Sequence, residues 1–269
     1  MLNSSITNQT WYITIFTQWL CTIVTAAHSR IKPRILYSAF ELTAKMAFEG
    51  IIASTIGFAP AVIVCYFFTK DFFELCEEGE IVRLFGLGMV FGFFVALIYG
   101  SLGIYLVALD WSIIIYVITI PLMTTLGFFV MLHSRRRVGK KSTAIHAPML
   151  GAGFSSMSTT YIVYREILIS AASIDLLTYL SMVAVFLALS LANSAAYVSV
   201  STIQGIGSYS GYFREHYLKS LLVLSTYSII LLPYMWRVKY SILYLGFAVA
   251  YSYTALYLTK RIYKLNISR

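Results

Sequence analysis

Polar side chains recur along one face of an otherwise apolar stretch, residues 176–204. They follow steps of four, three, four and three residues, with an amide beside them: Ser190, Ser194, Tyr197, Ser201 and Gln204, and Asn193. In an α-helix this spacing places the hydroxyl and amide groups on one side. Inside a bilayer such a face turns away from lipid, towards other helices or water. The chemistry that these residues predict is therefore hydrogen bonding, either between helices or to water in a passage.

A second polar set lies in the preceding apolar stretch, residues 147–170, and includes Ser155, Thr159 and, further on, Glu166. If the two stretches face each other, the two sets together form what we call the polar seam. One interpretation is hydrogen bonding between helices, worth only about 0.6 kcal/mol per pair on average in a membrane. The other is a hydrated passage, and the length of the polar stripe keeps this second interpretation open.

Small residues recur every four positions in the stretch 83–109, at Gly88, Gly92, Ala96 and Gly100. This spacing lines them along one ridge of a helix. Lipid gives no hydrophobic drive for helix association, so small residues stabilise a bundle by letting backbones approach closely. We expect this helix-packing ridge to form a tight contact within the bundle or with another subunit.

Sequence motifs of the common hydrolases and nucleotide-binding enzymes are missing. There is no His-Glu-x-x-His zinc site, no Gly-x-Ser-x-Gly elbow and no Walker phosphate loop. The densest acidic cluster, Glu77 to Glu80, is typical of a solvated turn, and no acid clearly lies in mid-span, where an ion-coupled carrier would place one. We therefore expect a protein that is not an enzyme and that uses no catalytic residue, cofactor or metal.

The elements that must position these residues are long apolar segments. The chain has 269 residues, of which 59% are hydrophobic and only 12% charged, whereas soluble domains carry about a quarter charged residues. A helix needs about 20 apolar residues to cross a bilayer. Eight helices are predicted, near residues 11–28, 46–69, 83–109, 111–132, 147–170, 176–204, 217–235 and 238–258. The expected fold is all-α, a polytopic membrane helix bundle of seven or eight transmembrane helices in a single transmembrane domain, residues 1–269.

The net charge of +9 is typical of membrane proteins, which retain Lys and Arg in their cytoplasmic loops. With eight spans and both termini inside, thirteen Lys and Arg residues fall on the inner side and seven on the outer side. The inner set includes the Arg135–Lys141 cluster. We expect a multi-pass protein of the cell membrane with this basic side in the cytoplasm.

Several short motifs lie between residues 55 and 165: Ala59-Pro60, Tyr66, Lys70-Asp71, Phe85-Gly86 to Gly92, Pro121, the Arg135–Lys141 loop and Gly151-Ala152-Gly153-Phe154. Their order resembles the early and middle parts of the PrsW-type intramembrane proteases. The resemblance implies a related helical membrane fold. Where that family places paired glutamates, this chain has Thr124 and Thr125, so the resemblance implies a non-catalytic relative.

The chain is rich in Ile, Tyr and Ser, with 21 tyrosines, and its charge is sparse. In this overall character it is similar to membrane proteins of thermoacidophilic archaea, and among them to the polytopic, channel-like subunit of the archaeal DNA-import system. That resemblance implies DNA as cargo, other membrane subunits as partners and a separate ATPase. DNA affinity would come mainly from Lys and Arg meeting phosphates.

The sequence thus predicts a non-enzymatic polytopic subunit of a translocation or transport machine, embedded in membrane lipid. The passage would run along the polar seam, and the helix-packing ridge would hold the bundle or a partner. Two alternatives stay open. One is an inactive homologue of the PrsW-type intramembrane proteases, and the other is a stand-alone small-molecule permease.

Overall fold

The computed structural model describes residues 33–106, 115–134, 137–170, 176–235 and 241–267, and near some helix ends it describes the backbone alone. Residues 1–49 and residues 50–269 form two separate compact units. The described part of the first unit is the start of one long helix, and all other described elements belong to the second unit. The single transmembrane domain expected over the whole chain stays a prediction.

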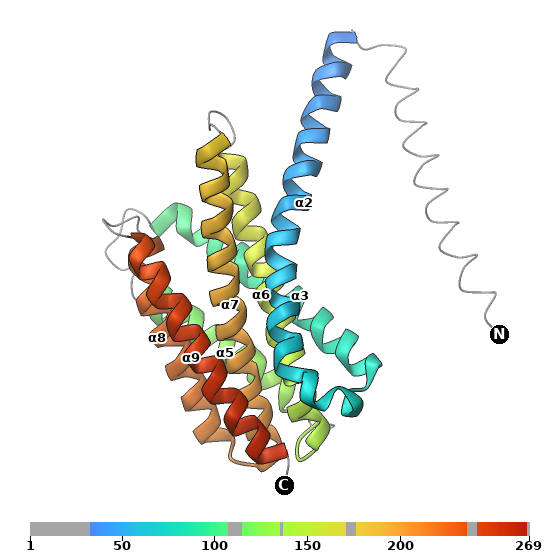
Figure 1. Cartoon of the computed structure of the whole chain (residues 1–269), viewed down its shortest axis with the longest axis vertical. Helices are drawn as coiled ribbons and strands as arrows, with labels where there is room; N and C mark the ends of the chain where they lie inside the picture. The colour runs from blue at the N-terminus through green and yellow to red at the C-terminus, as the bar shows by residue number, and fades with distance from the viewer. Residues whose placement is uncertain (1–32, 107–114, 135–136, 171–175, 236–240, 268–269) are drawn as a thin grey trace, which may run out of the picture. The chain divides into compact units, whose positions relative to one another are not determined.

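All regular elements of the described residues are helices (Figure 1). In chain order they are α2 (Pro33–Thr69), the 3-10 helix η1 (Lys70–Leu75), α3 (Glu78–Leu106), the π-helix η2 (Ile115–Thr119), α5 (Ile120–Leu132), α6 (Lys141–Ser170), α7 (Leu176–Ser210), α8 (Phe213–Met235) and α9 (Ser241–Ile267). The expected all-α fold is confirmed. Seven of the eight predicted helices correspond to these elements with shifted ends, and the first, residues 11–28, lies outside the described residues.

Two glycines with positive φ shape the turns at one end of the bundle. Gly211, at φ 80°, follows α7, and its N–H donates to the carbonyl of Gly207 over 3.0 Å, which closes the end of the helix. Gly139, at φ 74°, precedes α6 and donates its N–H to the carbonyl of Ser208 over 3.0 Å. Glycine suits both positions because it has no Cβ to clash in this conformation. The second bond fastens the α5–α6 connection to the end of α7.

Four helices are long and apolar enough to cross a membrane: Ala47–Phe72, Glu78–Ile98, Tyr179–Ser210 and Ile242–Asn266. The segment Val117–Leu132 is apolar but shorter. The seven or eight spans expected from the sequence thus exceed the number that meets these criteria among the described residues. The difference comes mainly from α6, which carries many hydroxyl residues, and from α8, whose first two turns are charged and polar.

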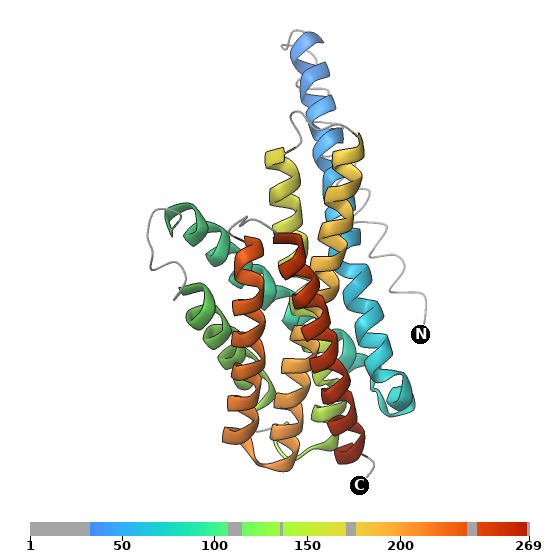
Figure 2. The same ribbon diagram turned by 60° about the vertical axis from the view of Figure 1, so that its left-hand side comes forward.

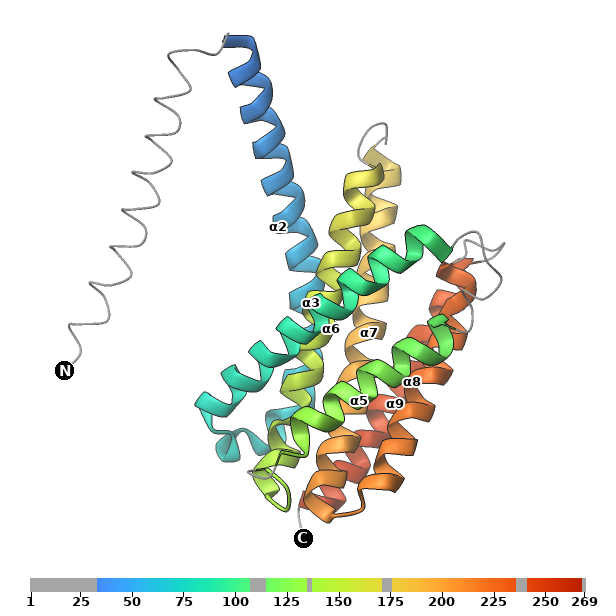
Figure 3. The same ribbon diagram turned by 180° about the vertical axis from the view of Figure 1, so that it is seen from behind.

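The polar helix α6 lies in the interior of the bundle, where every residue from 143 to 156 is buried. Figure 1, Figure 2 and Figure 3 each show α6 and α7 side by side, and Figure 3 shows α3 crossing α6 obliquely. α8 and α9 pack against α7 and against each other. Because neighbouring helices shield α6, its hydroxyl groups do not have to face lipid.

Glycine contacts set the distance between α3 and α6. A Cβ added to Gly88 would lie 2.8 Å from the backbone nitrogen of Phe154, and one added to Gly92 would lie 3.0 Å from the Cα of the same residue. Ala96, one turn further along α3, is also buried, whereas Gly100 lies where only the backbone is described. The described part of the helix-packing ridge therefore faces α6, within the bundle.

Other glycines bring α6 equally close to its remaining neighbours. A Cβ on Gly57 of α2 would lie 2.6 Å from the carbonyl oxygen of Ser156. A Cβ on Gly151 of α6 would lie 2.7 Å from the carbonyl carbon of Tyr197 on α7. Gly153 of α6 fits in the same way against the backbone of α3. Close backbone approach on three sides allows the buried helix to pack tightly against its neighbours.

Replacing Gly88 by alanine is therefore expected to lower the thermal stability of the purified protein in detergent. The added methyl group would force α3 and α6 apart at backbone atoms, and overpacking of this kind destabilises by about 1–3 kcal/mol. Gly86→Ala is the matched control on the same helix, because a Cβ there has no heavy atom within 4 Å. Circular dichroism melting of both variants measures the difference, and equal melting temperatures would contradict the assigned contact.

Candidate functional site: the polar seam of α6 and α7

The polar seam is closed at its centre by a pair of serines. Ser155 of α6 and Ser194 of α7 are both fully buried. The Ser155 hydroxyl donates to the Ser194 hydroxyl over 3.3 Å, and it also lies 3.0 Å from the carbonyl of Ala152 in its own helix. The short side chains let the two helices touch here, so this part of the seam leaves no open channel.

Asn193 joins three helices one residue away from that pair. Its Nδ2 donates to the hydroxyl of Thr159 on α6 over 3.1 Å. Its Oδ1 accepts a hydrogen bond from the Tyr227 hydroxyl on α8 over 2.5 Å. The Asn193 side chain is 6% exposed and that of Thr159 is fully buried, so each bond satisfies a polar group that has little access to water.

A cavity of about 50 Å³ adjoins Asn193 and is lined by residues of α3, α6, α7, α8 and the start of α5. Its polar lining consists of one amide and four hydroxyl groups, from Ser158, Asn193, Tyr197, Tyr227 and Ser228. The remaining lining is apolar and includes Ala96 of the helix-packing ridge. A space of this size has room for a few water molecules and needs polar partners to keep them. The seam therefore touches a small hydratable cavity at its centre.

The other predicted members of the seam are less closely connected. Ser201 faces α6, where its hydroxyl lies against Gly151. Gln204 turns instead to α5 and donates its Nε2 to the carbonyl of Thr125 over 2.9 Å. Ser190 is fully buried, and its hydroxyl has no hydrogen-bond partner among the described residues. Glu166 is half-buried in the last third of α6. The seam is thus continuous at its centre and interrupted towards both ends.

Two residues of the site escaped the sequence analysis. Tyr227 and Ser228 of α8 complete the cavity, but their helix was predicted as an ordinary apolar span. The signal was available in the run Ser225 to Ser228, four consecutive hydroxyl residues in the middle of an apolar segment. Such a run indicates a polar contact, as the polar stripe on α7 does, because buried hydroxyl groups are usually hydrogen-bonded.

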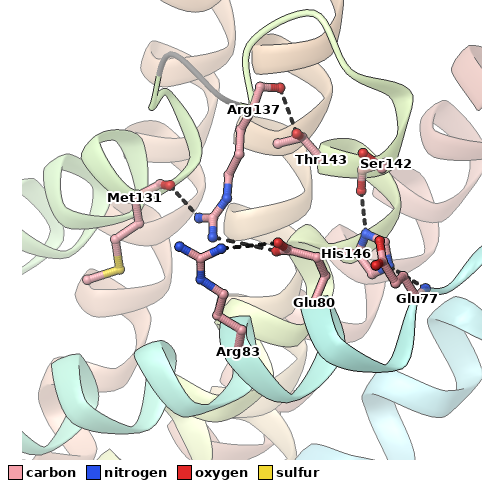
Figure 4. A network of polar contacts seen from close by, with 8 residues as sticks. All are labelled: Glu77, Glu80, Arg83, Met131, Arg137, Ser142, Thr143 and His146. Carbon is pink, nitrogen blue, oxygen red and sulfur yellow. Dashed lines mark hydrogen bonds and ion pairs between the residues drawn. The ribbon is translucent and has the colours of Figure 1, made fainter.

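Two titratable residues of α6, His146 and Glu166, are far apart. Among the described residues, no group of three or more His, Cys, Asp or Glu side chains could hold a metal ion. His146 is committed on both ring nitrogens (Figure 4), since Nε2 accepts the N–H of Glu77 over 2.9 Å and Nδ1 donates to the carbonyl of Ser142 over 2.7 Å. Glu166 lies 20 residues further along α6, roughly 30 Å at the rise of an α-helix. These two residues therefore cannot work together.

Positive charge gathers at one end of the bundle, which we call the basic end and which lies at the bottom of Figure 1. α3, α6 and α8 begin there, and α2, α7 and α9 finish there. Ten of the eleven described lysines and arginines from residue 50 onward belong to it: Lys70, Arg83, Arg137, Lys140, Lys141, Arg214, Lys219, Lys260, Arg261 and Lys264. The remaining one, Arg165, lies near the far end of α6.

An ion-pair cluster fixes two segments of the basic end to each other. The Asp71 carboxylate of η1 lies 2.6 Å from the Lys264 ammonium and 3.5 Å from the Lys260 ammonium, both on α9. Lys260 also donates to the carbonyl of Phe67, and its Nζ lies 4.0 Å from the centre of that ring. One carboxylate is therefore shared by two cations, which leaves this part of the basic end with an excess of positive charge.

Comparisons with known proteins add no relative. No protein-family model matches the chain, and neither the curated proteins nor the solved structures gave a significant match. The resemblances to PrsW-type proteases and to the archaeal DNA-import subunit rest on the sequence features alone.

The bond between Asn193 and Tyr227 can be tested with a double-mutant cycle. Asn193→Ala and Tyr227→Phe each remove one partner, and we expect a coupling energy of about 0.6 kcal/mol, the average for such bonds in membranes, and at most about 1.7 kcal/mol. Tyr251→Phe is the matched control, because this half-buried tyrosine donates elsewhere, to the carbonyl of Val223. Its coupling with Asn193→Ala should be near zero. Unfolding free energies in mixed micelles give both values, and equal couplings would contradict the assignment.

Proposed function

We propose that the chain is a non-enzymatic subunit of a membrane translocation machine, and that the polar seam is the closed state of its passage. The observation that carries the proposal is the burial of hydrogen-bonded hydroxyl and amide groups between α6 and α7, beside a cavity with five polar lining residues. Polar side chains in membrane helices turn away from lipid, and some of them line substrate pathways.

The hydrogen bonds of the seam are only a small part of what keeps it closed. Three hydrogen bonds hold its centre: Ser155–Ser194, Asn193–Thr159 and Tyr227–Asn193. At the average value for membrane helices they contribute roughly 2 kcal/mol in total. Water entering an opened passage would replace these bonds. A partner that binds the open state more tightly than the closed state would shift the population towards the open state.

The same proposal includes more than four crossings. α6 has 30 residues, which corresponds to about 45 Å and is enough to cross the hydrocarbon core. Its polar side chains do not prevent this because its neighbours shield them. We propose that α5 and α8, which pack against the same bundle, cross as well. Together with the four apolar helices this gives seven spans, or eight with the first predicted segment, in the cell membrane and with the basic end in the cytoplasm.

The partners follow from the chemistry of the chain. It carries no Walker phosphate loop, so the energy for transport would come from a separate ATPase. The basic end would attract an anionic cargo, and DNA is the cargo that the resemblance to the archaeal import subunit suggests. Attraction of this kind comes from lysine and arginine near phosphates and weakens as salt concentration rises.

Isolation of the tagged chain from its native membrane in a gentle detergent tests the proposal, with mass spectrometry of the associated proteins. We expect an ATPase and other membrane proteins in stoichiometric amounts, and none of them in membranes that lack the tag. A chain that is isolated alone contradicts the subunit proposal. Solute flux in liposomes containing the pure chain would then indicate the stand-alone permease.

A further inference from the structure

A second polar hollow lies at the basic end, away from the seam. It measures about 230 Å³ and is formed by the turn before α3, the first turns of α3 and the α5–α6 connection. Nearly all of its lining residues are polar or charged, among them Glu77, Glu80, Arg83, Arg137, Lys140 and His146. Figure 4 shows most of these side chains converging from separate segments. We call this hollow the end pocket.

Arg137 is held rigidly at one wall of the end pocket. Only 12% of its side chain is exposed. Its Nη1 donates to the carbonyl of Met131 over 2.7 Å, and its own carbonyl accepts the Thr143 hydroxyl over 2.7 Å (Figure 4). Burial lowers the pKa of this guanidinium, while the nearby Glu80 carboxylate acts in the opposite direction. A positive charge is thus fixed in a place where it is only partly hydrated.

The acids of the end pocket do not balance its cations. The single Glu80 carboxylate serves two guanidinium groups, with Arg83 at 3.2 Å and Arg137 at 3.6 Å. Lys140 adds a third positive charge at the rim. The other lining acid, Glu77, is exposed, as are Arg83 and Lys140. The three cations and two acids of the lining therefore leave a net charge of +1 in the hollow.

His146 braces the pocket. Its Nε2 accepts the Glu77 N–H and its Nδ1 donates to the Ser142 carbonyl, so both ring nitrogens are occupied. It ties the turn before α3 to the first turn of α6. The walls that carry the arginines are therefore connected before any ligand arrives, and preorganisation of this kind reduces the entropy lost on binding.

We propose that the end pocket binds a phosphate group, carried either by the headgroup of an anionic membrane lipid or by a soluble phosphate. The guanidinium fork matches phosphate oxygens in geometry and charge. Basic pockets at the cytoplasmic ends of membrane helices are typical sites for anionic lipid headgroups. This site goes beyond the proposed passage and does not depend on it, because none of the polar-seam residues lines the end pocket.

Substitution of Glu80 distinguishes a phosphate-binding site from a set of purely structural ion pairs. A bound phosphate must compete with Glu80 for the guanidinium groups of Arg83 and Arg137. Glu80→Gln removes that competitor and should tighten phosphate binding several-fold. If the ion pairs of Glu80 only stabilise the turn, the same substitution changes the stability of the protein and no phosphate binding is detected.

The test uses the full-length chain in a neutral detergent, titrated separately with dioctanoyl phosphatidylglycerol and with inorganic phosphate at constant ionic strength. Lys140→Gln should weaken binding about fivefold, the effect of one lysine near a phosphate surface. Lys219→Gln is the matched control, since this lysine belongs to the same basic end but pairs with Glu215 outside the pocket. It should leave the dissociation constant unchanged.

Saturable binding of phosphatidylglycerol alone identifies a lipid headgroup as the source. Binding of inorganic phosphate, with or without the lipid, identifies the phosphate group itself. Either result supports the site when Lys140→Gln weakens it and Lys219→Gln does not. Absence of saturable binding, or equal effects of the two lysine variants, overturns the proposal. The comparison of the two lysine variants tests the proposal even if the Glu80→Gln variant does not fold.

Discussion

The structure depends on one constraint, the burial of a polar helix inside a bundle made of apolar ones. α6 carries hydroxyl groups on several sides, and exposure of these groups to hydrocarbon would be unfavourable. Helices on three sides cover it, and they approach closely because Gly57, Gly88 and Gly151 leave no Cβ in the way. Hydrogen bonds to α7 then satisfy the hydroxyl groups that face it. Glycine and serine are thus complementary here, one bringing the backbones together and the other providing the bonds between them.

Periodicity along the chain predicted much of this arrangement. The four-residue repeat of small residues on α3 identified the surface that meets α6, and the alternating steps of four and three identified the face of α7 that carries Asn193 and Ser194. Helix periodicity gives the face of a residue but not the identity of the neighbour. For this reason Gln204 could be assigned to the polar face of α7 but not to its actual partner, the backbone of α5. The contribution of Tyr227 was missed because its helix was classified by average hydropathy.

The end pocket could not have been predicted in the same way. Arg83 and Arg137 come from segments more than 50 residues apart in the sequence, and only the folding of two turns onto the start of α6 brings them to one carboxylate. A related effect separates hydropathy from packing. Mean hydropathy depends on the composition of one segment alone, so it does not register that neighbouring helices shield the hydroxyl groups of α6. The number of helices and the fold class can be inferred from the composition of the chain. The rotation of each helix, the helices that shield it and the contacts between loops depend on the packing of the whole bundle.

Water access to the seam in the native membrane tests the central claim most directly. Ser194→Cys and Leu187→Cys place one thiol each on α7, the first in the seam and the second on an exposed apolar face, with Cys21, Cys65 and Cys76 replaced by alanine. A charged methanethiosulfonate reagent reacts with hydrated thiolates and not with thiols in lipid. The passage predicts that the Ser194→Cys variant is labelled faster than the Leu187→Cys variant in membranes that contain the assembled machine. Labelling of the seam thiol that is no faster than labelling of the lipid-facing thiol would show that the seam is a permanently closed helix contact.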